Sequence, residues 1–192
     1  MLINVNPLLS PDILATLRSM GHGDRFVLSD ANFPSFSHTD NLLRMDGLNI
    51  PQAAEALLSV FPLDSFIAEP VNRMEIDGKP DEINDVHQDL IDTVNKVSGP
   101  NWKIGSIERQ QFYLEAKETF AVITTSDTRP YGCFMFTKGV LLSLIHISEP
   151  TRLGMSRSII IMSKKFKDLF NTSNPIIAMV HLPALPGSPL YD

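Results

Sequence analysis

The sequence predicts an α/β fold in which helices pack on both faces of a mostly parallel central sheet, a three-layer sandwich. Segments whose apolar residues recur at helical spacing alternate along the chain with short apolar runs that suit strands. The clearest run, residues 26–28, follows the turn of Gly21, His22 and Gly23 and is apolar without alternation. Because both faces of such a strand must be covered, we expect it in the interior of the sheet.

Four helices are predicted from apolar spacing and from end signals. The first begins with a capping Ser10 and with Pro11 at the first helical position. In the third, apolar residues from Ile83 to Val97 repeat at three and four, and His87 is expected beside that stripe as a partly exposed residue. The predicted helices cover residues 11–20, 51–61, 81–97 and 108–118.

Six strands are predicted from short apolar runs bounded by turn residues. Asp46 and Gly47 end the second strand, and Pro70 keeps the end of the third away from a central ladder position. A turn at residues 126–130 joins the last two strands. The predicted strands cover residues 26–28, 42–45, 65–68, 102–104, 120–125 and 133–136.

Composition limits the classes of function. The 192 residues allow one ordinary domain with an extra segment, or two small domains. A net charge of −6 argues against nucleic acid, which requires a basic surface. The single cysteine, Cys133, excludes an internal disulfide framework and any multi-cysteine metal site. With no secretory leader and no membrane-length apolar run, a cytoplasmic protein is expected.

Two residues at the ends of the predicted inner strand are candidates for a site. His22 precedes this strand, and Asp30 follows it at the carboxyl end, where ligands of open α/β sheets gather. A histidine suits an acid/base role, and a carboxylate can accept a hydrogen bond from a hydroxyl. The simpler alternatives are that His22 is only a turn residue and Asp30 only a cap.

Seven short segments along the chain can be compared with known families. They are Leu8-Leu9-Ser10-Pro11, Met20-Gly21-His22-Gly23-Asp24, Asp30-Ala31-Asn32-Phe33-Pro34, Arg44-Met45-Asp46-Gly47, Pro62-Leu63-Asp64, residues 109–116 and Tyr131-Gly132. In this order they resemble the D-ribose pyranase/fucose mutarotase family, and within it the L-fucose mutarotases. The resemblance covers residues 1–141, about the length of a whole family member.

The resemblance implies a mutarotase that interconverts the anomers of a free reducing monosaccharide, L-fucose first. It also implies a homo-oligomer, a decameric ring in the family, with sites near subunit contacts and with no metal or cofactor. By position, His22 is the acid/base residue and Asp30, Arg109 and Tyr131 bind the sugar, with Gly132 and Cys133 beside them. Because the family often has Asn where this chain has Cys133, a side-chain amide contact is missing and a backbone contact is expected to remain.

The chemistry agrees with these residue types. Opening a hemiacetal ring requires a proton on the ring oxygen and loss of one from the anomeric hydroxyl, and a histidine with an ordinary pKa of about 6.5 can do both near neutral pH. Cys133 is expected to be a small buried hydrophobe. Two other functions remain open: a D-ribose pyranase, and a sugar-binding module without turnover.

The chain changes character after Leu141. Acids outnumber bases before that point, whereas the rest is more basic and rich in proline. Residues 142–156 resemble a translated sequencing adapter, and residues 162–192 resemble the amino terminus of the BtpA family of (β/α)₈ barrels. We therefore expect a mutarotase domain over 1–141, an artefactual linker over 142–161 and then a truncated fragment. The fragment offers one barrel strand, which cannot close a sheet, and no stable fold is expected for it.

Overall fold

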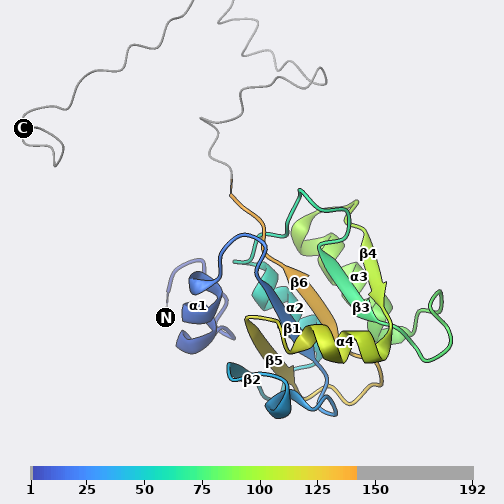
Figure 1. The fold of residues 1–192 in the computed structure, drawn as a ribbon. Coiled ribbons are helices and arrows are strands. Elements are labelled where there is room, and N and C mark those ends of the chain that lie inside the picture. Colours follow the sequence, from blue (N-terminus) through green and yellow to red (C-terminus); the bar gives the residue numbers. More distant parts are fainter. Residues whose placement is uncertain (1, 142–192) are drawn as a thin grey trace, which may run out of the picture. The chain divides into compact units, whose positions relative to one another are not determined.

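A computed structural model describes residues 2–141 of the chain (Figure 1). Its centre is a six-stranded sheet with the order β2-β5-β1-β6-β3-β4. The predictions for residues 142–161 and 162–192 lie outside the described residues. The strands are β1 (Arg25–Ser29), β2 (Leu42–Met45), β3 (Val71–Met74), β4 (Ile104–Ile107), β5 (Ala121–Thr125) and β6 (Phe134–Thr137).

Strand β1 occupies the interior of the sheet, as its apolar run predicted. It pairs in parallel with β5, with Phe26 opposite Ala121, and in antiparallel with β6, with Phe26 opposite Phe136. Strands β2 and β5, and strands β3 and β4, are parallel pairs, whereas β3 and β6 are antiparallel. Five strands therefore run in one direction and only β6 runs against them, which confirms the mostly parallel sheet.

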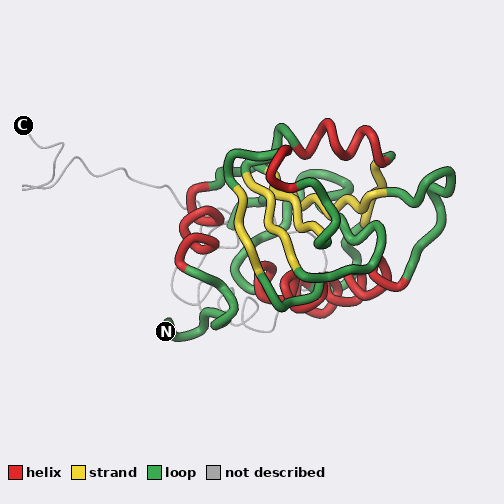
Figure 2. Tube along the Cα trace, turned by 90° about the horizontal axis from the view of Figure 1, so that it is seen from below, coloured by secondary structure: helices red, strands yellow, loops and turns green. Residues whose placement is uncertain are grey.

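Helices cover both faces of the sheet (Figure 2). Phe26 and Leu28 face a core built with helices α1, α2 and α3, whereas Val27 faces a second core that includes Phe112 and Ala116 of α4. Successive side chains of β1 thus pack into two separate cores, one on each face of the sheet. The predicted three-layer arrangement is therefore confirmed. The helices are α1 (Pro11–Ser19), α2 (Ile50–Leu58), α3 (Asp85–Ser98) and α4 (Arg109–Ala116), with a 3₁₀ turn η1 at Ser35–Ser37.

The helix starts follow from side-chain caps. Ser10 accepts the N–H of Ile13 at 3.3 Å, as expected for a capping hydroxyl. Asn49 and Gln52 form a reciprocal capping box at the start of α2. Each such cap satisfies donors that the first helical turn leaves free and contributes about 1 kcal/mol.

The predicted strand over residues 65–68 is wrong. Asp64 Oδ1 accepts the N–H of Phe66 at 2.9 Å, and this local bond turns the chain instead of extending it. Phe66 and Ile67 are largely exposed. The strand lies further along at Val71–Met74, where Asn72 and Arg73 interrupt the apolar pattern.

The start of the third helix also differs from the prediction. Helix α3 begins at Asp85 because Asn84 caps it, its Oδ1 accepting the N–H of His87 at 3.0 Å. Ile83, expected in the buried stripe, precedes the helix and is 48% exposed. His87, expected to be partly exposed, is completely buried. The spacing of the apolar residues therefore predicted the wrong exposure for His87.

Candidate functional site

The candidate site is a cavity of about 250 Å³ where the loop after β1 meets the loop before β6. It brings together predicted site residues that are distant in the sequence. It is lined by Asp30, Asn32, Phe33, Met74, Arg109, Tyr113, Pro130, Tyr131 and Cys133.

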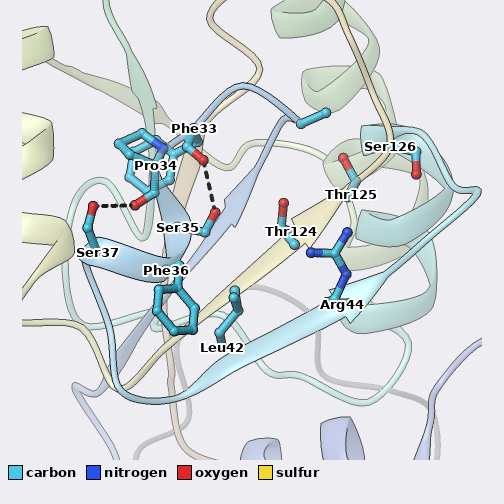
Figure 3. A pocket seen from close by; sticks show the side chains of 11 residues that line it. Phe33, Pro34, Ser35, Phe36, Ser37, Leu42, Arg44, Thr124, Thr125 and Ser126 are labelled. Carbon is cyan, nitrogen blue, oxygen red and sulfur yellow. Dashed lines mark hydrogen bonds between the residues drawn. The ribbon is translucent and has the colours of Figure 1, made fainter.

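A larger cavity, of about 450 Å³, shares Phe33 with this one (Figure 3). Its polar groups are already engaged within the protein. Arg44 is paired with Asp46, whose oxygens lie 2.9 to 3.1 Å from its guanidinium nitrogens. Ser126 accepts the N–H of Gly47 at 2.8 Å. We take the cavity at Asp30 as the candidate site, because the predicted residues Asp30, Arg109, Tyr131 and Cys133 line it.

Asp30 lies immediately after β1 and is 4% exposed. Its Oδ1 accepts the N–H groups of Asn32 at 2.8 Å and of Phe33 at 3.1 Å. Its Oδ2 accepts the N–H of Gly132 at 3.1 Å and faces the thiol of Cys133 at 3.4 Å. Four donors thus surround one carboxylate, which fastens the two loops to each other.

Helix α4 contributes Arg109 and Tyr113 to the cavity, one turn apart on the same face. Arg109 forms an ion pair with Asp77, with Nε 3.0 Å from Oδ1. The ring of Tyr113 stacks on Phe33 with centroids 5.5 Å apart. Burial, and then the nearby thiol of Cys133, raise the pKa of Tyr113, so its hydroxyl stays protonated and can donate a hydrogen bond.

The loop before β6 presents Tyr131 and Gly132. Tyr131 has a φ of +60°, a left-handed conformation that is uncommon for an aromatic residue. Gly132 lies so close to Asp30 that an added Cβ would be 3.2 Å from the Cβ of that residue. Behind the loop, the buried His87 lies with Nε2 3.0 Å from the carbonyl oxygen of Tyr131.

Cys133 is buried, as predicted, and points at Asp30. Burial, and then the neighbouring carboxylate, raise the pKa of its thiol well above the ordinary value. Since the thiolate is the reactive form, we expect Cys133 of the folded protein to resist thiol-specific reagents at neutral pH. Ellman's reagent should report no accessible thiol in the native protein and one per chain in denaturant, because the chain has a single cysteine. Rapid native labelling would contradict this placement.

His22 lies at the other end of β1, away from this cavity. The five residues of β1 alone span about 17 Å, and His22 precedes them while Asp30 follows. Its Nε2 donates to Asp64 Oδ2 at 3.1 Å, and its side chain remains 46% exposed. The ring of Phe66 packs edge-on at 5.7 Å. Within one protomer, no single monosaccharide can touch both His22 and Asp30.

The buried His87 should make the fold sensitive to acid. Burial, and then the positive charge of Arg73, lower its pKa to about 4, although the bond to the Tyr131 carbonyl opposes this. An unfolded histidine titrates near 6.5, so the unfolded chain takes up the proton first as the pH falls. Stability is therefore complete above about pH 6.5 and decreases toward pH 4, by about 2 kcal/mol between pH 7 and pH 5 from this group.

Urea unfolding at pH 7 and pH 5 measures this loss. Other groups titrate over the same range, so the contribution of His87 is the difference between wild type and His87→Gln, which cannot take up the proton. An identical pH dependence in both proteins would contradict the prediction.

Sequence reasoning missed four residues that lie around the Asp30 cavity or beside His22. Tyr113 carried a usable signal, since it lies one turn from Arg109 on the same helix face. Asp64 belongs to one of the segments that carried the family resemblance. Asp77 and His87 gave no signal, because their partners are distant in the sequence. Among residues 2–141, no three histidine, cysteine or acidic side chains are grouped so that they could hold a metal ion.

Several known proteins are similar to this chain in sequence. The RbsD / FucU transport protein family model matches residues 3–141. The chain is 36% identical to the L-fucose mutarotase of Haemophilus influenzae over 141 residues, 73% of this chain and 97% of that protein. It is 39% identical to the human fucose mutarotase over 142 residues, 71% of this chain and 92% of that protein.

A solved structure is similar as well. The fucose mutarotase of Streptococcus pneumoniae in complex with L-fucose superposes with a TM-score of 0.68 at 33% identity, covering 73% of this chain and all of that one. In the described part of the chain, no helix has the length and apolar character needed to cross a membrane.

Proposed function

We propose a function for this chain on the premise that it belongs to the RbsD / FucU transport protein family. It is an isomerase, a mutarotase that interconverts the anomers of a free reducing monosaccharide, most specifically L-fucose. One observation carries this proposal: Asp30, Arg109, Tyr131 and Cys133, predicted from the sequence, line one cavity. The curated relatives named L-fucose mutarotase support the choice of sugar.

In the proposed mechanism, His22 transfers the protons. The ring oxygen of the sugar gains a proton, the anomeric hydroxyl loses one, and the bond between the ring oxygen and the anomeric carbon breaks to give the open aldehyde. Rotation about the bond between the aldehyde carbon and the next carbon exposes the other face of the aldehyde. Ring closure by the reverse steps then produces the other anomer. Asp64, whose Oδ2 lies 3.1 Å from His22 Nε2, holds the imidazole in place.

The residues at the Asp30 cavity bind the sugar. Arg109 presents a guanidinium that can donate to sugar oxygens, and Tyr131 offers a phenol. The Gly132 N–H already donates to Asp30, and the Cys133 carbonyl accepts the N–H of Met74 at 2.9 Å. A carbonyl oxygen can accept a second hydrogen bond, so the backbone contact to the sugar that was expected here stays part of the proposal, beside the contacts from the side chains.

Because His22 cannot reach the cavity of its own protomer, the proposed site needs a second copy of the chain. The exposed His22 of one protomer would face the Asp30 cavity of its neighbour. The exposed Phe66 beside His22 supports a contact there, since it is apolar and 64% exposed. A homo-oligomeric ring, the decamer that the family resemblance implies, provides such contacts. A cytoplasmic location remains part of this proposal.

The residues after 141 are proposed to be foreign to the enzyme. The match to the family model ends at residue 141, which supports a boundary there. Sequencing an uncloned copy of the locus across codons 138 to 165 tests this idea. An uninterrupted natural reading frame would overturn it.

Magnetisation-exchange NMR on the full chain tests the proposed activity. The rate of exchange between the α and β anomers of L-fucose is measured with and without protein, and D-ribose is measured alongside. We expect faster exchange for L-fucose. Acceleration with D-ribose alone would favour a pyranase, and sugar binding without acceleration would favour the non-catalytic module.

A further inference from the structure

Three side chains at the start of α3 hold three consecutive residues of the loop before β6. Asn84 Nδ2 donates to the carbonyl oxygen of Pro130 at 2.9 Å. His87 Nε2 lies 3.0 Å from the carbonyl oxygen of Tyr131. Arg129 Nη1 donates to a carboxylate oxygen of Asp89 at 2.6 Å. We refer to Asn84, His87 and Asp89 as the α3 clamp.

His87 is the buried member of the α3 clamp. It is completely inaccessible to solvent, and its ring packs edge-on against Phe134 with centroids 5.7 Å apart. A carbonyl oxygen can only accept, so Nε2 carries the proton and donates to Tyr131. Nδ1 is buried and has no hydrogen-bond partner among residues 2–141. Burying a polar ring with one nitrogen unpaired is unfavourable, and core packing alone gives no reason for it.

His87 donates its hydrogen bond to Tyr131, whose backbone conformation is unfavourable. Tyr131 has a φ of +60°, which costs of order 1 kcal/mol or more for a residue with a side chain. Such a conformation persists only where its surroundings fix it. On one side Asp30 accepts the N–H of Gly132 at 3.1 Å, and on the other His87 donates to the carbonyl oxygen of Tyr131. The backbone at Tyr131 is thus held from both sides.

We propose that His87 is a positioning residue for the sugar site: it fixes the backbone of Tyr131 so that this residue lines the Asp30 cavity. His87 itself is not among the residues that line the cavity, so it acts only through Tyr131. The inference rests on the proposed function, because the benefit of an ordered Tyr131 is realised when a sugar binds. Preorganised contacts lower the entropic cost of binding.

The test replaces the donor and then restores it. His87→Phe keeps an aromatic ring but removes the hydrogen bond, and His87→Gln keeps an amide donor. From the loss of one buried hydrogen bond we expect the KM for L-fucose exchange to rise about tenfold in His87→Phe, with a smaller change in kcat. The KM of His87→Gln should fall back toward the wild-type value.

Two further variants separate positioning from stability. Val94 is a completely buried residue of the same helix and is not part of the α3 clamp. Val94→Ala leaves a cavity in the core beside the helix, so it should lower the Tm without changing the KM. Asn84→Ser keeps a capping oxygen for α3 but loses the donor to Pro130. It should raise the KM less than His87→Phe, and it provides the test if His87→Phe does not fold.

The outcomes distinguish this inference from the proposed function. Wild-type exchange no faster than in buffer would overturn both. An active wild type with an unchanged KM in His87→Phe, or in Asn84→Ser where His87→Phe is unfolded, would overturn only the positioning role. A KM that rises equally in Val94→Ala would also overturn it, since loss of stability would then be sufficient.

Discussion

Replacing His22 with alanine is expected to remove most of the catalysed anomer exchange, lowering kcat by about 10²- to 10⁴-fold, the usual contribution of a positioned acid/base group. The substitution should not disturb the fold, because the side chain is 46% exposed and, within the described part of the chain, hydrogen-bonds to Asp64 alone. Exchange NMR at saturating L-fucose measures the effect.

The matched control removes another exposed side chain that pairs with a carboxylate. Lys96→Ala loses a surface contact to Glu55 at 2.9 Å and should leave the exchange rate unchanged. The exchange rate of Asp64→Asn should lie between those of the control and of His22→Ala. The imidazole keeps a hydrogen-bond partner in this variant, but that partner no longer carries a negative charge. Equal exchange in wild type and His22→Ala would remove His22 from the mechanism.

Replacing Asp30 with alanine is expected to cause the largest loss of stability among the site residues. Three backbone N–H groups, those of Asn32, Phe33 and Gly132, would lose their acceptor in a buried place. A buried donor without a partner costs about 1 to 3 kcal/mol, so the free energy of unfolding should fall by several kcal/mol. Sugar binding should weaken as well, since the two loops that enclose the cavity would separate.

Urea unfolding measures the stability of Asp30→Ala, and NMR line broadening of L-fucose measures binding. Asp46→Ala is the control, because Asp46 is exposed and, among the residues that the structure describes, pairs with Arg44 alone. Its effect should stay within about 0.5 kcal/mol. If the two alanine variants were equally stable, Asp30 would not be the anchor of these loops.

Much of the fold could be predicted because its signals are local. The run at residues 26–28 indicated an inner strand, and the caps and prolines indicated where α1 and α2 begin. The strand at Val71–Met74 could not be recognised, because Arg73 is a charged residue buried in a sheet with its guanidinium bonded to the carbonyl of Pro80. Only the folded chain brings those groups together.

The residues of the candidate site stay a prediction from the sequence, and only part of their layout could be foreseen. Sequence spacing placed His22 and Asp30 at opposite ends of one strand, and the structure agrees. It also offered two interpretations of Asp30, a ligand for sugar or a cap, and the residue bonds the backbone as a cap while lining the cavity. The burial of His87 depends on a carbonyl 44 residues away, which local periodicity cannot reveal.

In the proposed shared site, the separation of His22 from the Asp30 cavity along β1 would give each molecule two half-sites, one at each end of that strand. Two variants damaged at different ends, His22→Ala and Arg109→Ala, should each be inactive alone. Dissociated, mixed and allowed to reassemble, they should complement one another, because some pockets would then combine an intact imidazole from one molecule with an intact guanidinium from its neighbour. Activity should also decline on dilution, since a lone molecule would carry every necessary group and still be unable to turn over a sugar.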